Sequence, residues 1–289
     1  HGLMLVGDLF VDSGDVMIAP DQLWDNYSLT FETRMGAKIA TFPMFAGTGR
    51  GFNVEGFANA LRTHGSAKNK LHVMLNFPNN PTGYMPTVEE GKGMVAALEA
   101  QAKRGTKLIV LCDDAYFGLF YHLGAPSMTE SLFGQLCNLH RNLLPIKLDG
   151  ATKELFVWGL RCGFVTFGLG HADNAQAALD AFDAKSRADI RSAISNSPMI
   201  SQSIVEKALA SAAIVEERKQ KLGVLEARAK EVYKVANEAR FTDSWEVYPF
   251  NSGYFMLIKV KGVDANRLRE HLLDKHGTGL ICTSPTDLR

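Results

Sequence analysis

Short β-branched runs alternate with amphipathic helical segments over the first 170 residues, and this alternation constrains the fold more than any other feature. Each run is bounded by Gly, Pro or Asp, as is typical of strands. A strand–helix–strand repeat predicts an α/β fold whose mostly parallel sheet is covered by helices on both faces. The expected strands are residues 15–20, 37–45, 70–78, 106–116, 144–150 and 163–170.

The clearest helical segment is PTVEEGKGMVAALEAQAKRG, which follows the third strand-like run. Thr87 and Glu90 have the T-x-x-E spacing of a capping box, in which each side chain satisfies a backbone N–H at the start of a helix. Apolar residues then recur at helical spacing, and Gly105 ends the segment. This segment is expected to cover one face of the sheet.

Beyond Gly170 the pattern changes. Residues 200–240 carry one long helical periodicity, and WEVYPF, GYFMLIKV, a helix over 264–275 and GLICT follow it. This order predicts a smaller α+β unit at the C-terminal end. We therefore expect a large cofactor-binding domain over residues 1–215 and a small domain over 216–289, and both ends of the sequence look cut.

Composition narrows the function classes. The 289 residues carry a formal net charge of +0, so no overall basic field would attract nucleic acid or an anionic membrane surface. No apolar run approaches the roughly 20 residues that a membrane-spanning helix needs. The four cysteines are scattered without C-x-x-C spacing. These features predict a cytoplasmic protein with no nucleic-acid or membrane partner.

Three polar residues follow or end strand-like runs. Asn80 follows the run at 70–78, Asp113 ends the strand expected over 106–112 of the fourth run, and Lys153 follows the strand expected over 144–149. Because the carboxyl ends of parallel strands share one edge, ligands of open α/β folds bind there. Lys153 also lies between the small residues 150–152 and an apolar run, where its amine would be partly desolvated. An amide, a carboxylate and an amine are therefore expected to converge on one ligand.

Pyridoxal 5′-phosphate is a ligand of this kind. Its aldehyde needs a lysine for a Schiff base, its ring nitrogen needs a carboxylate to stay protonated, and its phosphate needs a cation or a helix N-terminus. Lys153, Asp113 and Arg161 supply these three groups. No histidine cluster with metal-ligand spacing is present in the sequence, so a metal cofactor is not expected.

Four sequence blocks carry a resemblance to a known family. NFPNNPTG (76–83), DDAYFGL (113–119), TKELFVWGLRCG (152–163) and NSGYFM (251–256) occur in that order. In this order they resemble the fold-type I pyridoxal-phosphate aminotransferases, the aspartate aminotransferase superfamily (class I/II). Any one block is weak alone, whereas the ordered set is specific.

The resemblance implies a role for each matching residue. Lys153 would form the Schiff base and, once released by substrate, move a proton between the substrate α-carbon and the cofactor. Asp113 would pair with the ring nitrogen, and Asn80 and Tyr116 would bond the ring's 3′ oxygen. Asn80 would also border the substrate, and Arg161 would hold the phosphate. Lys153, Asp113 and Tyr116 are thus the expected catalytic residues.

Two further roles rest on looser matches. PDQLWDNYSLTF is similar to the family's P-x-W-x-N-H segment, which makes Trp24 the candidate to stack on the ring, although Tyr27 replaces the histidine. Arg289 resembles the arginine that receives the substrate α-carboxylate. Many members carry a phosphate-binding serine where this chain has Gly150, and Thr152 is the residue that could supply a hydroxyl instead.

The expected function is transfer of an amino group between an amino acid, aspartate-like or aromatic, and a 2-oxo acid. The resemblance also implies a homodimer with shared active sites. Two alternatives stay open at this point. A lyase or decarboxylase would use the same cofactor with another outcome, and an aminotransferase-like sensor domain would belong to a transcriptional regulator.

Overall fold

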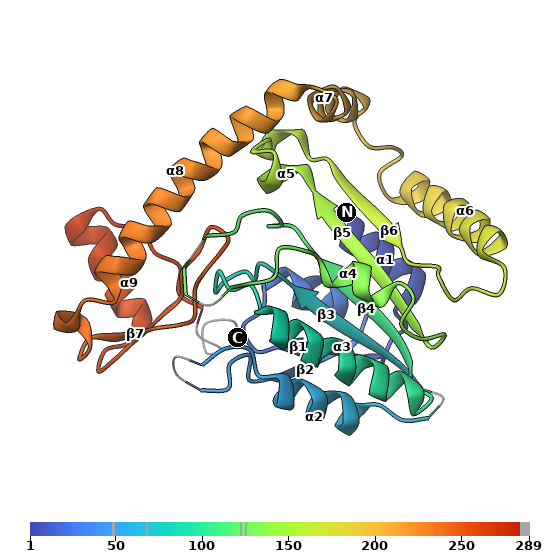
Figure 1. The fold of residues 1–289 in the computed structure, drawn as a ribbon, viewed down its shortest axis with the longest axis horizontal. Coiled ribbons are helices and arrows are strands. Elements are labelled where there is room, and N and C mark those ends of the chain that lie inside the picture. Colours follow the sequence, from blue (N-terminus) through green and yellow to red (C-terminus); the bar gives the residue numbers. More distant parts are fainter. Residues whose placement is uncertain (48–49, 68, 122, 125, 284–289) are drawn as a thin grey trace.

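A computed structural model describes residues 1–47, 50–67, 69–121, 123–124 and 126–283. Its centre is a six-stranded sheet with the order β2-β1-β3-β4-β5-β6 (Figure 1). Every neighbouring pair is parallel except β5 and β6, so the expected mostly parallel sheet is confirmed. The strands are β1 (Val16–Pro20), β2 (Lys38–Phe42), β3 (Lys70–Asn76), β4 (Lys107–Asp113), β5 (Leu143–Gly150) and β6 (Gly163–Phe167).

Both faces of the sheet are buried, which explains why the central strands are continuously apolar rather than alternating. Successive residues point to opposite sides, so Val110 belongs to one core cluster and Leu111 to the other. Helices α2 (Val54–His64) and α3 (Val88–Lys103) pack on the Val110 face. Helix α1 (Gly2–Phe10) and the π-helix η1 (Ser28–Arg34) pack on the Leu111 face.

The expected helix after the third strand is confirmed as α3. Thr87 Oγ1 accepts the backbone N–H of Glu90 at 3.3 Å, and the Glu90 carboxylate accepts the backbone N–H of Thr87 at 2.7 Å. This reciprocal pair is the predicted capping box. Gly105 has a φ of +97°, a left-handed conformation that stops the helix.

The remaining elements form an arch beside the sheet and a small second sheet (Figure 1). Strands β7 (Trp245–Val247) and β8 (Ile258–Val260) pair antiparallel. Helix α8 crosses toward this unit and packs on the Tyr121 loop through Leu222 and Leu225. The helices are α4 (Leu132–Leu136), α5 (Ala151–Glu154), η2 (Trp158–Leu160), α6 (Ala175–Ala193), α7 (Met199–Leu209), α8 (Ala212–Ala236), η3 (Ala239–Phe241) and α9 (Ala265–His276).

Three sequence expectations differ from the structure. The segment expected as one long helix over 200–240 is two helices, α7 and α8, because Ser211 caps α8 by accepting the N–H of Ala213. GYFMLIKV (253–260) forms a strand only over β8, and the backbone N–H of its first residue, Gly253, donates instead to the carbonyl of Leu119. Residues 279–283, the GLICT segment, contain no strand.

Candidate active site

The parallel register brings the predicted strand ends together. Asn76, the last residue of β3, is the partner of Asp113, which in turn is the partner of Leu148 on β5. The loops that follow these strands therefore leave from one edge of the sheet. A cavity of about 550 Å³ opens there. Five of the predicted site residues line it, namely Trp24, Asp113, Thr152, Lys153 and Arg161.

Lys153 sits in the single turn of α5, directly after β5. Within the described residues its amine has no hydrogen-bond partner, and Nζ lies 4.6 Å from the centroid of the Tyr116 ring. Burial lowers the pKa of Lys153, while the charge of Asp113 raises it and that of Arg161 lowers it. A lysine with a lowered pKa has a larger neutral fraction, the form that attacks a carbonyl carbon.

Asp113 is the last residue of β4 and is 5% exposed. The Tyr27 hydroxyl donates to its Oδ2 at 2.5 Å, and the backbone N–H of Ala115 donates to its Oδ1 at 3.1 Å. Burial raises the pKa of Asp113, whereas these two hydrogen bonds and the charge of Lys153 act to lower it. The carboxylate is thus fixed in the wall of the cavity.

Asn80 and Tyr116 come from different loops and meet at the same edge. The Asn80 amide donates to the Tyr116 hydroxyl at 3.3 Å. Asn76 supports both loops, because its Oδ1 accepts the N–H of Asn80 and its amide donates to the carbonyl oxygen of Asp113. Burial raises the pKa of Tyr116 to about 12, so its hydroxyl stays protonated near neutral pH. Two neutral donors therefore lie side by side.

The first and fourth sequence blocks bind each other directly. Asn251 accepts the N–H of Met85 and donates to the carbonyl of the same residue, at 2.8 and 2.9 Å. The backbone N–H groups of Asn251 and Ser252 both donate to the carbonyl of Gly83. A Cβ at Gly83, whose φ is +67°, would clash with the Phe255 carbonyl. The close approach of these two backbones thus requires glycine.

Arg161 and Trp24 border the cavity from different loops. Arg161 has a left-handed backbone, with φ of 51°, and its Nη1 donates to the Trp158 carbonyl at 3.1 Å. Trp24 is 37% exposed, and its ring meets the Tyr27 ring edge-on at 5.7 Å. Both side chains are therefore in contact with the space beside Lys153 and Asp113.

Arg289, the predicted carboxylate-binding residue, lies outside the described residues. Sequence reasoning missed two other contributors. In the sequence, Tyr27 stands out only because it replaces the family's histidine. Its polar hydroxyl, three positions after Trp24, was the signal that could have indicated a role in the site. Sequence reasoning also missed Tyr254, whose hydroxyl donates to the carbonyl oxygen of Lys153 at 3.3 Å.

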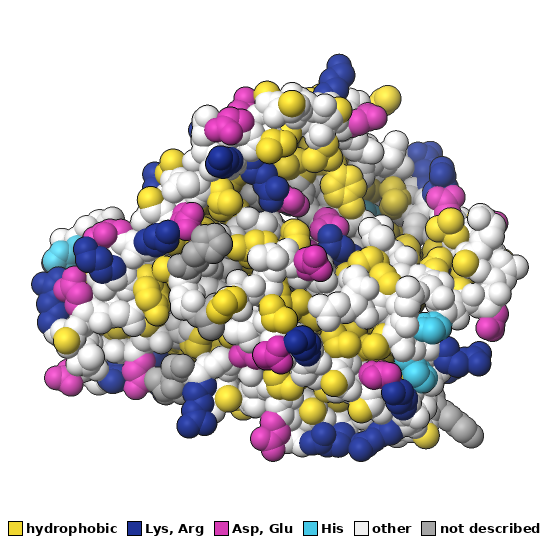
Figure 2. All heavy atoms as spheres, in the orientation of Figure 1, with side chains coloured by type: hydrophobic (Ala, Val, Ile, Leu, Met, Phe, Trp, Pro, Cys, Tyr) yellow, Lys and Arg dark blue, Asp and Glu magenta, His cyan; other side chains and the backbone are white. Residues whose placement is uncertain are grey.

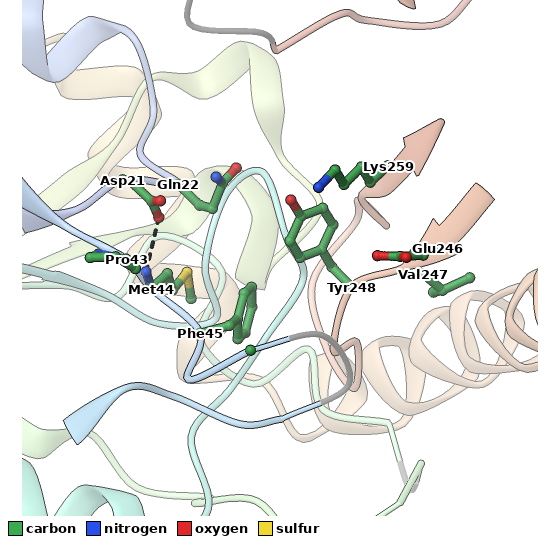
Figure 3. A pocket seen from close by; sticks show the side chains of 10 residues that line it. Asp21, Gln22, Pro43, Met44, Phe45, Glu246, Val247, Tyr248 and Lys259 are labelled. Atoms are coloured by element: carbon green, nitrogen blue, oxygen red, sulfur yellow. Dashed lines mark hydrogen bonds between the residues drawn. The ribbon is translucent and has the colours of Figure 1, made fainter. Parts of the chain in front are cut away.

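A second cavity, of about 200 Å³, lies between the ends of β1 and β2 and the small β7–β8 sheet (Figure 3). Tyr248 and Lys259 reach into it from the small sheet, opposite Asp21 and Gln22. The Phe45 and Tyr248 rings lie 5.7 Å apart across this space. The cavity is thus a contact zone between the large sheet region and the small one.

Two properties of the described residues bear on partners. No described helix combines the length and the apolar character that crossing a membrane requires. Nor do three His, Cys, Asp or Glu side chains gather as a metal site within the described ranges.

Several large apolar side chains of α7 are exposed, among them Met199 and Ile200, and Figure 2 shows hydrophobic side chains around that end of the molecule.

Comparison with known proteins identifies the family. Residues 3–289 match the family described as aminotransferase class I and II, and the chain belongs to that family. The sequence resemblance and the fold expectation are thereby confirmed.

Individual relatives are distant. The cytoplasmic aspartate aminotransferase of Saccharomyces cerevisiae is 24% identical over 197 residues, which are 67% of this chain and 44% of that protein. An aminotransferase from Anaerococcus prevotii superposes with a TM-score of 0.77 at 23% identity, covering 94% of this chain and 64% of that one.

Cystalysin from Treponema denticola, whose structure contains pyridoxal 5′-phosphate, superposes with a TM-score of 0.72 at 13% identity, covering 96% of this chain and 64% of that one. The chain therefore spans less than half the length of the curated relative and about two thirds of these solved structures.

Proposed function

We propose that the protein is a pyridoxal-phosphate-dependent aminotransferase that moves an amino group between an amino acid and a 2-oxo acid. The observation that carries the proposal is the pairing of Lys153 and Asp113 in one cavity. An amine with a lowered pKa and a buried carboxylate, not bonded to each other, are the two groups that the aldehyde and the ring nitrogen of this cofactor require.

The residues present fit the cofactor. The Asp113 carboxylate has both oxygens held by the protein on one side and lines the cavity on the other. Arg161 lines the same cavity and would bind the phosphate by charge-assisted hydrogen bonds, with Thr152 as an added hydroxyl donor. Asn80 and Tyr116 would donate to the ring's 3′ oxygen. The exposed Trp24 ring would cover one face of the cofactor.

When bound, the cofactor supplies an electron sink that lets a proton leave the substrate α-carbon. Lys153 Nζ would hold the cofactor by its aldehyde carbon, and once substrate had displaced it, the free amine would accept the substrate α-proton and return it to complete the transfer. The Asp113 carboxylate would accept a hydrogen bond from the ring N–H and so favour the positively charged form of that nitrogen. Arg289 would orient the substrate through its α-carboxylate, and Asn80 would border the same carboxylate.

Support for the choice of reaction comes from the family and from the named aminotransferases with the same fold. Aspartate-like and aromatic donors remain the proposed substrates, and the name of the yeast relative supports the first. That name also supports a cytoplasmic location.

The division at residues 215 and 216, which falls inside α8, remains a prediction. A homodimer is proposed because the apolar side chains of α7, such as Met199 and Ile200, lack cover within the described chain.

The test is covalent trapping followed by a donor screen. Borohydride treatment of the protein with pyridoxal 5′-phosphate should fix the cofactor on Lys153, found by peptide mapping, and Lys153→Ala should abolish both trapping and turnover. Lys147 is the matched control, since it lies on β5, directly before the α5 turn that holds Lys153, but is paired with Asp149 at 2.7 Å. Trapping on Lys147 would refute the assignment. Release of ammonia without any 2-oxo acceptor would indicate the lyase instead.

A further inference from the structure

Tyr27 is a buried polar residue that the proposed mechanism does not yet use. It is 1% exposed and belongs to the core cluster beneath the sheet, with Met17, Phe31 and Leu111. Its hydroxyl donates a hydrogen bond to Asp113 Oδ2 at 2.5 Å, a residue 86 positions further along the chain. A short bond between a neutral phenol and a carboxylate is of the charge-assisted kind.

This bond determines which way the carboxylate faces. A carboxylate has about four acceptor positions on its two oxygens. Tyr27 occupies one on Oδ2 and the Ala115 N–H occupies one on Oδ1, so the carboxyl plane is fixed from both ends. Asp113 also lines the cavity that contains Lys153. The acceptor positions left open are the ones available to a ligand in that cavity.

The bond also acts on the charge of Asp113. Burial raises the pKa of this carboxyl and so favours its neutral form. The groups that oppose burial are the Tyr27 hydroxyl, the Ala115 N–H and the charge of Lys153, while the charge of Asp149 adds to the effect of burial. Burial and the nearby Asp113 charge raise the pKa of Tyr27 well above its ordinary value, so the phenol remains a donor.

We propose that Tyr27 is a positioning residue that keeps Asp113 charged and aimed at the ring nitrogen of the bound cofactor. This inference rests on the proposed function. Tyr27 also contacts the ring of Trp24, which lies three residues before it on the same loop. The loop after β1 would therefore have two roles. Its Trp24 would cover one face of the cofactor ring, and its Tyr27 would hold Asp113 against the ring nitrogen.

A purely structural tyrosine provides the matched control. The Tyr84 hydroxyl donates to Glu90 at 2.8 Å, and that carboxylate serves the cap of α3 rather than the cavity. Tyr27→Phe and Tyr84→Phe each remove one phenol–carboxylate bond and keep the aromatic ring in place. A role in stability alone predicts similar effects of the two changes, whereas a role toward Asp113 predicts different ones.

The first measurement uses the cofactor-free protein. Carboxyl groups of 13C-labelled aspartates are titrated by NMR, and the Asp113 signal is assigned by its loss in Asp113→Asn. Tyr27→Phe should raise the pKa of Asp113 further, and Tyr84→Phe should leave it unchanged. An unchanged Asp113 titration in Tyr27→Phe would overturn the inference whether or not the protein uses this cofactor.

The second measurement is the affinity for pyridoxal 5′-phosphate across pH. Tyr27→Phe should weaken binding by about 10- to 100-fold, the effect of losing one hydrogen bond to a charged group, and Tyr84→Phe should not. The loss should grow as pH falls, because the less supported Asp113 becomes protonated first. A loss independent of pH would point to packing and contradict the inference.

The two proposals fail separately. If the unaltered protein does not bind the cofactor, the proposed function fails, while the NMR titration still decides the role of Tyr27. If Tyr27→Phe does not fold, 3-fluorotyrosine in place of tyrosine tests the same bond. The more acidic phenol is a stronger donor and should lower the pKa of Asp113, and an unchanged value would again overturn the inference.

Discussion

Charged side chains cluster at both ends of the parallel strands, at the amino edge where the strands begin and at the carboxyl edge where they finish. The two clusters differ in whether their charged groups have partners within the protein. At the amino edge, Asp15 Oδ2 lies 2.7 Å from Lys70 Nζ and 3.0 Å from His72 Nε2, and Lys70 also pairs with Asp12 at 2.6 Å. At the carboxyl edge, no hydrogen bond or ion pair within the described chain joins Lys153 to Asp113, and both line a cavity.

The difference separates a structural cluster from a binding site. Opposite charges that meet directly leave little for a ligand to satisfy, and their effect falls on folding stability. An amine and a carboxylate held apart, with shifted pKa values and open acceptor positions, remain available to a ligand. The Asp15 cluster therefore serves as a control, within the same sheet, for mutational tests of Asp113.

Asp113→Asn should have the largest effect on turnover. An amide cannot hold a proton on the ring nitrogen by charge, so kcat should fall by about 10² to 10³, in the range seen when one electrostatic contact to a transition state is lost. Borohydride trapping on Lys153 should persist, because the amine is untouched. Steady-state kinetics with an amino donor give the measurement, and an unaltered kcat would exclude Asp113 from the reaction.

Asp15→Asn makes the same chemical change at the other edge and should affect stability instead. Lys70 and His72 would lose their shared partner, at a cost of about 1–3 kcal/mol in the free energy of unfolding. Urea denaturation at neutral pH measures this loss. Turnover per folded molecule should match that of the unaltered protein, and a hundredfold fall would mean that the two clusters are coupled.

The pH dependence of that stability difference sharpens the comparison. Although burial opposes it, the hydrogen bonds from Lys70, the Asp12 backbone and His72 lower the pKa of Asp15. A lowered folded-state pKa gives stability that is present above the unfolded value of about 3.9 and is lost as pH falls through the folded value. The gap between the unaltered protein and Asp15→Asn should therefore shrink below about pH 4, and a constant gap would refute the charge argument.

Gly150→Ser should have the smallest effect, and it should act at the carboxyl edge alone. Gly150 has an extended backbone, with φ of −144°, and a Cβ there would meet only the Thr152 nitrogen at 4.0 Å. A serine therefore fits and adds a hydroxyl beside the proposed phosphate position. Affinity for pyridoxal 5′-phosphate should rise severalfold, by about 0.5–1.5 kcal/mol. Affinity for pyridoxal, which lacks the phosphate, serves as the control and should not change.

Local sequence signals predicted much of the fold. Each of the six strand-like runs overlaps an observed strand, and the Thr87–Glu90 cap forms as expected, because both features depend on neighbouring residues. Prediction failed where long-range contacts override periodicity. GYFMLIKV (253–260) has a strand-like sequence, yet only residues 258–260 form β8. Gly253 bonds instead to Leu119, and the preceding Asn251 and Ser252 bond to Met85 and Gly83, about 170 positions away.

The candidate site shows the same division. Asn80, Asp113 and Lys153 were predicted because each follows or ends a strand, and a parallel register then requires their loops to share an edge. The role of Tyr27 could not be predicted in this way. Its hydroxyl reaches Asp113 because Tyr27 and Phe31 of η1 pack in the same core cluster as Leu111 of β4. No local sequence pattern predicts that contact between distant segments.

Sequence alone thus determined the order of strands and helices, the family and the residue types available for chemistry, since periodicity, caps and motifs are local properties of the chain. Tertiary structure decided which charges are paired and which are left open. Lys70 and Lys153 are both lysines near strand ends, but Lys70 meets two carboxylates while Lys153 lies over the Tyr116 ring. That difference depends on packing between distant segments, which sets burial and therefore the charge that each group can hold.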